Sequence, residues 1–260
     1  MQSLKAMMNP GRIEATKSPK PMIARLKTLL HLGAQQLTTK TISDEYINWL
    51  TFANAGMLTK GNIYAMRFAI ENLPSGVPVV EIGSFCGLSA NVISYLLKIA
   101  GKNNKIFCCD KWIFEGSENG PNLGNSQISH KDYRNFVKSS FIRNIEFFSP
   151  DNKPFAVEQT SDEFFLLWQK HAKANDIFGR TTILGGEIAF AYIDGNHTYE
   201  FAKRDFKNID KSLELGGFIL FDDSSDADPF GLSKLMKEIK HNSNYQVVMK
   251  NPNYLFKKIA

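Results

Sequence analysis

The stretch VPVVEIGSFCGLSANVISYLL, residues 77–97, places an apolar run, a glycine turn and an apolar-periodic segment in succession. The apolar run predicts a buried strand that contains one carboxylate, Glu81, and the segment Leu88 to Ile99 predicts a helix. Gly83 and Gly87 would let the backbone pass close to a ligand, and the helix N-terminus would offer it free N–H groups. This order predicts a ligand site formed by a strand, a turn and a helix.

Strand and helix patterns alternate from Pro78 onward, which indicates an α/β fold with a doubly wound, mostly parallel sheet of seven strands. The expected strands are residues 78–83, 105–110, 154–159, 188–194 and 217–222, with an antiparallel closing pair at 245–249 and 253–258. Upstream of this domain, taken as residues 71–260, we expect a basic tail at 1–21 and a helical extension at 22–70. Within that extension, Ser43 looks like a helix N-cap.

Two further stretches, YIDGNH at 192–197 and LGGFILFDD at 215–223, deliver three carboxylates to the ends of apolar runs. Ligands of open α/β sheets bind outside the carboxyl ends of the strands, so Asp194, Asp222 and Asp223 are expected to converge on one crevice. Crowded carboxylates repel one another, and a cation or a proton relieves that repulsion. The sequence therefore predicts a site that holds one or the other.

The class of ligand follows from the glycine turn and from Asp110, which ends the second strand and could accept hydrogen bonds from a ribose. The turn lacks the middle glycine of G-x-G-x-x-G, and Glu81 would repel a phosphate, which argues against a nicotinamide-dependent reductase. S-adenosylmethionine carries a sulfonium, an amino group and a ribose but no phosphate. It is therefore the cofactor that these residues favour.

These stretches, in this order, resemble the class I S-adenosylmethionine-dependent methyltransferases. Within that class the chain is similar, over about residues 60 to 260, to the branch of macrocin, mycinamicin and aminocoumarin sugar O-methyltransferases. The resemblance implies a Rossmann-like sheet, the cofactor S-adenosylmethionine, a divalent metal (usually Mg²⁺) and a sugar or other small diol-containing acceptor. Cephalosporin-hydroxylase-like relatives share similar motifs, and a binding protein without catalytic activity could share the fold.

The resemblance and the residue chemistry together assign the site. The metal positions are Asp194, Asp222 and Asp223. The cofactor positions are Glu81, Gly83, Ser84, Gly87, Asp110, Ser161 and Asp194. Aminocoumarin sugar methyltransferases have a carboxylate base two residues after the first metal Asp, where this chain has Asn196. An amide cannot serve as a base, so His197, with Asp194, is the catalytic candidate. The alternative is that His197 caps a helix or orients a metal ligand.

Two segments keep two interpretations each. Thr160 or Ser161 is expected to hydrogen-bond the adenine amino group, since related methyltransferases hold the adenine ring at this position. The other interpretation is that Ser161 caps the helix that follows it, and both can hold at once. The loop from Trp112 to Ser129 is expected to be either a lid, with Trp112, Phe114 and His130 near the pocket, or a surface insertion.

Composition indicates a cytoplasmic enzyme, because no apolar run is long enough for a membrane span or a signal peptide. The net charge of +5 is concentrated in the first forty residues, which carry seven Lys or Arg and one acidic residue. No pattern of a nucleic-acid module is present. Three cysteines without metal spacing predict reduced, structural thiols. An apolar stripe between Ile42 and Leu58 suggests a homodimer contact.

Overall fold

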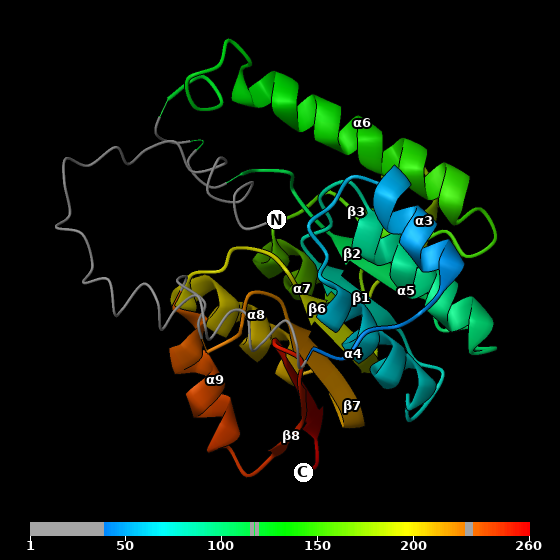
Figure 1. Cartoon of the computed structure of the whole chain (residues 1–260), viewed down its shortest axis with the longest axis vertical. Helices are drawn as coiled ribbons and strands as arrows, with labels where there is room; N and C mark the ends of the chain where they lie inside the picture. Colours follow the sequence, from blue (N-terminus) through cyan, green and yellow to red (C-terminus); the bar gives the residue numbers. More distant parts are fainter. Residues whose placement is uncertain (1–38, 115–116, 118–119, 227–230) are drawn as a thin grey trace, which may run out of the picture.

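The computed structural model describes residues 39–114, 117, 120–226 and 231–260. The expected tail at 1–21 and the first part of the helical extension lie outside these residues. Figure 1 shows a central sheet covered by helices on both faces. Within the described residues, no helix combines the length and the apolar character that crossing a bilayer requires.

The sheet has seven strands in the order β3-β2-β1-β6-β7-β9-β8. The first five of these strands are parallel, β9 runs antiparallel to β7, and β8 runs antiparallel to β9. The strand bounds are β1 Val79–Ile82, β2 Ile106–Cys109, β3 Phe155–Val157, β6 Ile188–Ile193, β7 Leu213–Phe221, β8 Tyr245–Lys250 and β9 Tyr254–Lys258. The predicted mostly parallel, seven-stranded fold is confirmed.

One face of the sheet carries the helices α3 (Glu45–Ala53), α4 (Lys60–Glu71), α5 (Leu88–Ile99) and α6 (His130–Phe148). The other face carries α7 (Ser161–Gln169), α8 (Tyr199–Asp210) and α9 (Leu232–Lys240). The buried strands separate two apolar cores, because successive side chains of a strand point to opposite faces. In β1, Val79 packs into the first core and Val80 into the second.

A short hairpin, β4 (Lys173–Asn175) with β5 (Thr181–Ile183), was not predicted. It lies beside the sheet edge formed by β3, where the N–H of Ile177 donates to the carbonyl of Ala156. Arg180 fastens it by donating to Asp176 and to the carbonyls of Lys153 and Pro154. The hairpin therefore blocks further strand addition at this edge.

The helical extension differs from expectation in two details. The N-cap of α3 is Asp44, whose side chain accepts from the N–H of Ile47, so the assignment of the cap to Ser43 was wrong. The expected apolar stripe is divided: Ile47 and Leu50 are buried in the core, whereas Trp49 and Phe52 are exposed. Each of the three cysteines is free and buried, as predicted.

Candidate active site

The strand order reverses between β1 and β6, and the two strands bring the glycine turn against Asp194. The N–H of Gly83 donates to the carbonyl of Cys109 at 3.0 Å, and the N–H of Asp194 donates to the carbonyl of Ile82 at 2.8 Å. Gly83 has a φ of +82°, and a Cβ there would lie 2.2 Å from the Asp194 carbonyl oxygen. Only glycine therefore permits this approach at the switch point, where open α/β sheets bind their ligands.

Glu81 lies fully buried just before the turn. Its Oε2 accepts from the hydroxyl of Ser84 at 2.5 Å, whereas its Oε1 has no hydrogen-bond partner among the described residues. Burial raises the pKa of the Glu81 carboxyl, and the neighbouring Ser84, Ser89 and Cys108 side chains lower it in part. A buried acceptor without a donor is costly, so this oxygen is suited to a donor group of a ligand.

Asp110 holds the turn from the end of β2. Its Oδ2 accepts from the backbone N–H groups of Ser84 at 2.8 Å and Phe85 at 3.0 Å, and its Oδ1 accepts from the N–H of Trp112. Burial raises the pKa of the Asp110 carboxyl, and these backbone donors lower it. Asp110 thus fixes the conformation of the turn, in which Phe85 has a φ of +45°.

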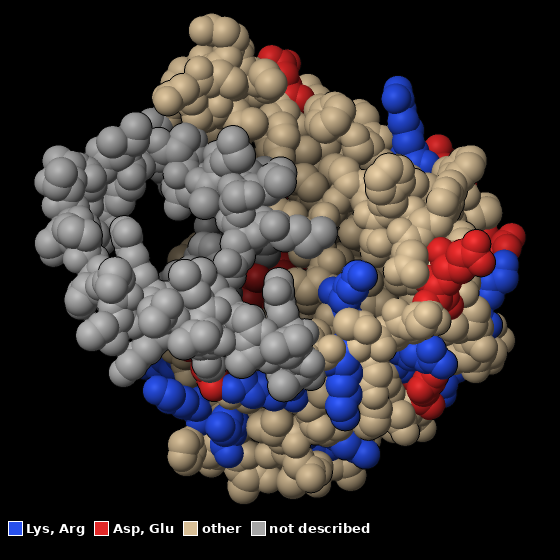
Figure 2. All heavy atoms as spheres, in the orientation of Figure 1, with Lys and Arg blue, Asp and Glu red and all other residues tan. Residues whose placement is uncertain are grey.

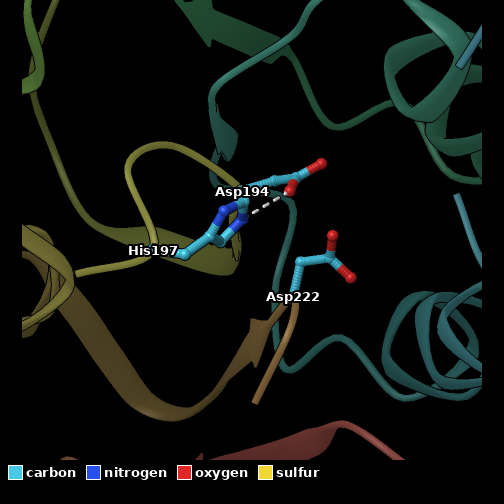
Figure 3. A group of neighbouring side chains, drawn as sticks. All are labelled: Asp194, His197 and Asp222. Atoms are coloured by element: carbon cyan, nitrogen blue, oxygen red, sulfur yellow. Dashed lines mark hydrogen bonds and ion pairs between the residues drawn. The ribbon is translucent and has the colours of Figure 1, made fainter. Parts of the chain in front are cut away.

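Asp194, His197 and Asp222 form one cluster in which a ligand atom of each lies within 4.8 Å of the others (Figure 3). His197 Nε2 is 3.1 Å from Asp194 Oδ1, and Tyr192 donates its hydroxyl to Asp194 Oδ2 at 3.2 Å. On the other side of the imidazole, Asp223 Oδ2 is 3.8 Å from His197 Nδ1. His197 therefore lies between two of the carboxylates that the sequence grouped together.

The carboxylates control the protonation of His197. Burial lowers the pKa of the imidazole, but the hydrogen bond to Asp194 and the charges of Asp194, Asp223 and Asp222 outweigh it and raise the pKa to about 9. An imidazolium is thus the stable form at neutral pH in this arrangement.

Asp222 is held by two asparagines that the sequence analysis did not single out. Its Oδ1 accepts from Asn62 Nδ2 at 2.5 Å and from Asn253 Nδ2 at 3.0 Å. All three side chains are buried. Asn62 lies within α4, and Asn253 belongs to the Asn-Pro-Asn turn between β8 and β9, so neither carries a sequence signal for a contact with Asp222.

The chain matches a known protein family. The profile of a family described as a methyltransferase domain matches residues 80–224, which include most of β1, the glycine turn, Asp194 and Asp222. The chain belongs to this methyltransferase family. The predicted membership of the class I S-adenosylmethionine-dependent methyltransferases is thereby confirmed. Among curated proteins, no match was found.

Solved structures share the fold of this methyltransferase at low sequence identity. The O-methyltransferase TomG of Streptomyces achromogenes, in complex with S-adenosylmethionine, is 11% identical with a TM-score of 0.52 over 89% of this chain and 96% of its own. The calicheamicin methyltransferase CalS11 is 15% identical with a TM-score of 0.52 over 95% and 96%. PaMTH1 of Podospora anserina, bound to S-adenosylhomocysteine, is 13% identical with a TM-score of 0.52 over 95% and 99%.

In this methyltransferase, Ser161 is the first residue of α7 and is not its N-cap. Thr160 is the N-cap, and it forms a capping box with Glu163. Ser161 instead lies beside the buried carboxyl of Asp205 on α8. Just before the cap, Gln159 Oε1 is buried without a hydrogen-bond partner in the described part of the chain.

Trp112 does not belong to a lid in this methyltransferase. Its ring is buried against Phe141, with the centroids 5.4 Å apart, and its Nε1 donates to the carbonyl of Phe85 at 2.9 Å. Phe114 remains close to the turn, since its ring centroid is 6.3 Å from that of Phe85. His130, the first residue of α6, has a buried Nδ1 without a partner among the described residues.

Proposed function

We propose that this methyltransferase transfers the methyl group of S-adenosylmethionine to a hydroxyl of a sugar or other small diol, assisted by a divalent cation. The close approach of Gly83 to Asp194 is the observation that supports this most directly. It places the glycine turn, which would receive the cofactor, against the cluster of Asp194, His197 and Asp222. A cofactor bound at the turn and an acceptor bound at the cluster would therefore lie close together, which lowers the entropic cost of bringing the methyl group and the hydroxyl into contact.

The buried acceptors fit the cofactor. Glu81 Oε1 and Gln159 Oε1 are buried without partners in the part of the chain that the structure describes. S-adenosylmethionine carries an amino group at its methionine end and another on its adenine, and both groups donate hydrogen bonds. We assign Glu81, Gly83, Ser84 and Gly87 to the methionine end, Asp110 and Asp194 to the centre, and Ser161 with Gln159 to the adenine end.

The cluster fits a divalent cation. Carboxylate oxygens are the ligands that Mg²⁺ and Mn²⁺ prefer, and Asp222 is held in one orientation by amides. We assign Asp194 and Asp222 to the cation, with Asp223 as the third carboxylate. His197 lies within the same cluster and is the proton acceptor in this proposal.

The reaction is an in-line displacement. The acceptor oxygen attacks the methyl carbon, the carbon–sulfur bond breaks, and its electron pair stays on sulfur, which leaves a neutral thioether. When bound, a divalent cation supplies Lewis-acid activation of the hydroxyl. Asp194 orients His197 through Nε2, so Nδ1 is the atom that takes the proton. With a cation bound to Asp194 and Asp222, the charges that raise the pKa of His197 would be neutralised, which would favour the neutral imidazole that a base requires.

The acceptor class is part of the proposal. CalS11 is described as a TDP-rhamnose 3'-O-methyltransferase, and its fold resembles that of this chain. Lys side chains lie over α9 on the face drawn in Figure 2, and Lys237 and Lys240 occupy the last turn of that helix, a distribution that suits an anionic acceptor such as a nucleotide sugar. We therefore expect the acceptor to present vicinal hydroxyls on a sugar.

Titration calorimetry with S-adenosylhomocysteine, with Mg²⁺ present and then with chelator, tests the proposal. We expect micromolar binding of the cofactor product by the wild-type protein and a Mg²⁺ signal that Asp222→Asn abolishes. Asp226→Asn is the matched control, because Asp226 is an exposed carboxylate on the same loop as Asp222 and pairs with Lys250 of β8. Absence of any S-adenosylhomocysteine binding would refute the proposed function.

A further inference from the structure

Asp222 is oriented by two segments that are far apart in the sequence. Asn62 lies in the first turn of α4, and Asn253 lies in the turn between β8 and β9. Besides their bonds to Asp222 Oδ1, the two amides bond to each other: Asn253 Nδ2 donates to Asn62 Oδ1 at 3.0 Å. Each amide therefore fixes the other in the orientation that points its donor at the carboxylate.

Asn62 also reaches the second carboxylate of the cluster. Its Nδ2 lies 3.3 Å from the hydroxyl oxygen of Tyr192, and that hydroxyl donates to Asp194 Oδ2. Tyr192 is fully buried, so this chain of hydrogen bonds is shielded from water. One amide group therefore contacts Asp222 directly and Asp194 through a single intervening hydroxyl.

Further contacts hold the two segments together. The side chain of Asn251 donates to the carbonyls of Lys40 and Gly61 and accepts from the N–H of Lys40 at 2.7 Å. Gly61 allows this, because a Cβ at that position would lie 1.8 Å from the Asn251 carbonyl oxygen. Asn253 Oδ1 in turn accepts from the N–H groups of Ser224 and Ser225, directly after Asp222 and Asp223.

From these contacts we propose that Asn62 and Asn253 are positioning residues for the cation-binding carboxylates, which makes α4 and the β8–β9 turn parts of the active site. The inference rests on the proposed function. Two amide donors occupy Oδ1 of Asp222 and keep its plane fixed, so the carboxylate meets a cation already oriented. Partners of this kind typically contribute about 10- to 100-fold to metal affinity.

The test compares two variants that remove an amide from the same buried junction. Asn62→Leu deletes the donor to Asp222, whereas Asn251→Leu deletes contacts with Lys40 and Gly61 and leaves Asp222 untouched. Mn²⁺ affinity is measured by the loss of the free-ion electron paramagnetic resonance signal. S-adenosylhomocysteine affinity is measured separately, because neither residue lies at the glycine turn.

We expect Asn62→Leu to weaken Mn²⁺ binding about 10- to 100-fold and Asn251→Leu to change it less than about threefold, with S-adenosylhomocysteine affinity kept in both. Equal Mn²⁺ affinity of Asn62→Leu and wild type, or an equal loss in Asn251→Leu, would overturn the inference and leave the proposed function standing. Failure of the wild-type protein to bind Mn²⁺ while it binds S-adenosylhomocysteine would overturn both the inference and the metal assistance.

A smaller change guards against a folding defect. If Asn62→Leu does not fold, Asn62→Ser removes the same donor without adding bulk, and it is expected to show the same selective loss of Mn²⁺ affinity. An unchanged affinity in a folded Asn62→Ser protein would likewise overturn the inference.

Discussion

Burial changes the pKa of the Glu81 carboxyl more than any neighbouring group does. Because the carboxylate loses its hydration without gaining a cation among the described residues, its pKa rises. The folded protein thus bears a cost for a charge whose counterpart, in our proposal, is the cofactor amino group. Function and stability should therefore respond in opposite directions to its removal.

We expect Glu81→Gln to lower the affinity for S-adenosylhomocysteine at least tenfold while it raises the melting temperature by about 3 °C, since an amide is cheaper to bury than a carboxylate. Calorimetry and thermal unfolding measure the two effects. Glu187→Gln, at an exposed position just before β6, is the control and should change neither. A drop in melting temperature for Glu81→Gln would contradict the prediction.

Asp205 provides a pH-dependent test. Burial raises the pKa of its carboxyl from 3.8 to about 6, and its Oδ1 has no hydrogen-bond partner among the described residues. The unfolded chain releases this proton at lower pH than the folded chain does. Stability therefore falls as the pH rises from about 4 to about 6 and stays lower above that range.

Asp205→Asn removes this loss. It should stabilise the protein by about 2–3 kcal/mol at pH 8 and much less at pH 4, as measured by urea unfolding at both values. Asp151→Asn, an exposed carboxylate paired with Lys98, should show no comparable difference between the two pH values. The same stabilisation at both pH values would refute the assignment of the shifted pKa to Asp205.

At the residue scale, the sequence predicts a functional position only where a residue breaks the pattern around it. Glu81, Gly83 and Asp194 were predicted as site residues because each interrupts or ends an apolar run, a position that indicates a site. Asn62 and Asn253 do not interrupt or end an apolar run. They come close to Asp222 only in the folded chain. Ser43 was predicted as a helix cap, and Ser161 was one of two interpretations of its position. In both places the cap is a neighbouring residue, Asp44 or Thr160, which also belongs to a preferred cap type.

At the scale of elements, the glycine turn joins β1 to α5 and depends on Gly83 more than on any other residue. We expect Gly83→Ala to destabilise the protein by at least about 3 kcal/mol, because it combines a positive φ with a Cβ only 2.2 Å from the Asp194 carbonyl oxygen.

Gly101→Ala is the matched control, since Gly101 has a φ of +63° but open space around it. It should cost only about 1 kcal/mol, the strain without the clash. Urea unfolding of the two variants measures the difference. Equal losses would mean that the approach of the turn to β6 adds nothing to the requirement for glycine.

The parallel strands and α5 were predicted closely because continuous apolar runs bounded by Gly or Asp have few alternative structures. The β4–β5 hairpin was missed because its strands are only three residues long and mostly exposed, which is too short for an alternation of polar and apolar residues to be recognised in the sequence. The sequence left the loop that begins at Trp112 with two interpretations, a lid or a surface insertion, because it is rich in Gly and Asn. The ring of Trp112 is buried because α6 brings Phe141 against it, and the loop sequence does not encode that contact.

For the whole molecule, the order of the strands makes the C-terminus indispensable. β9 lies between β7 and β8, and its Leu255 and Phe256 are fully buried. Truncation after Lys250 should therefore abolish cooperative unfolding, because it removes apolar burial of about 5 kcal/mol together with the pairing of both neighbours. Circular dichroism during thermal unfolding measures this.

Removal of Ile259 and Ala260 alone is the control, and it should leave cooperative unfolding intact, since β9 ends at Lys258. A cooperative transition in the protein truncated after Lys250 would show that the sheet does not need β9. At this scale the homodimer inferred from the sequence stays a prediction, for which the exposed Trp49 and Phe52 are the natural contact residues.

The bond between Asn62 and Asn253 spans 191 positions of the chain, and this separation sets the time at which the site can form. During synthesis α4 leaves the ribosome early, long before its partner amide has been translated. Because Asn253 is translated long after Asn62, both amide donors to Asp222 are present only once the two segments have been made. A nascent chain that stops before residue 253 therefore lacks one of the two bonds that orient this carboxylate.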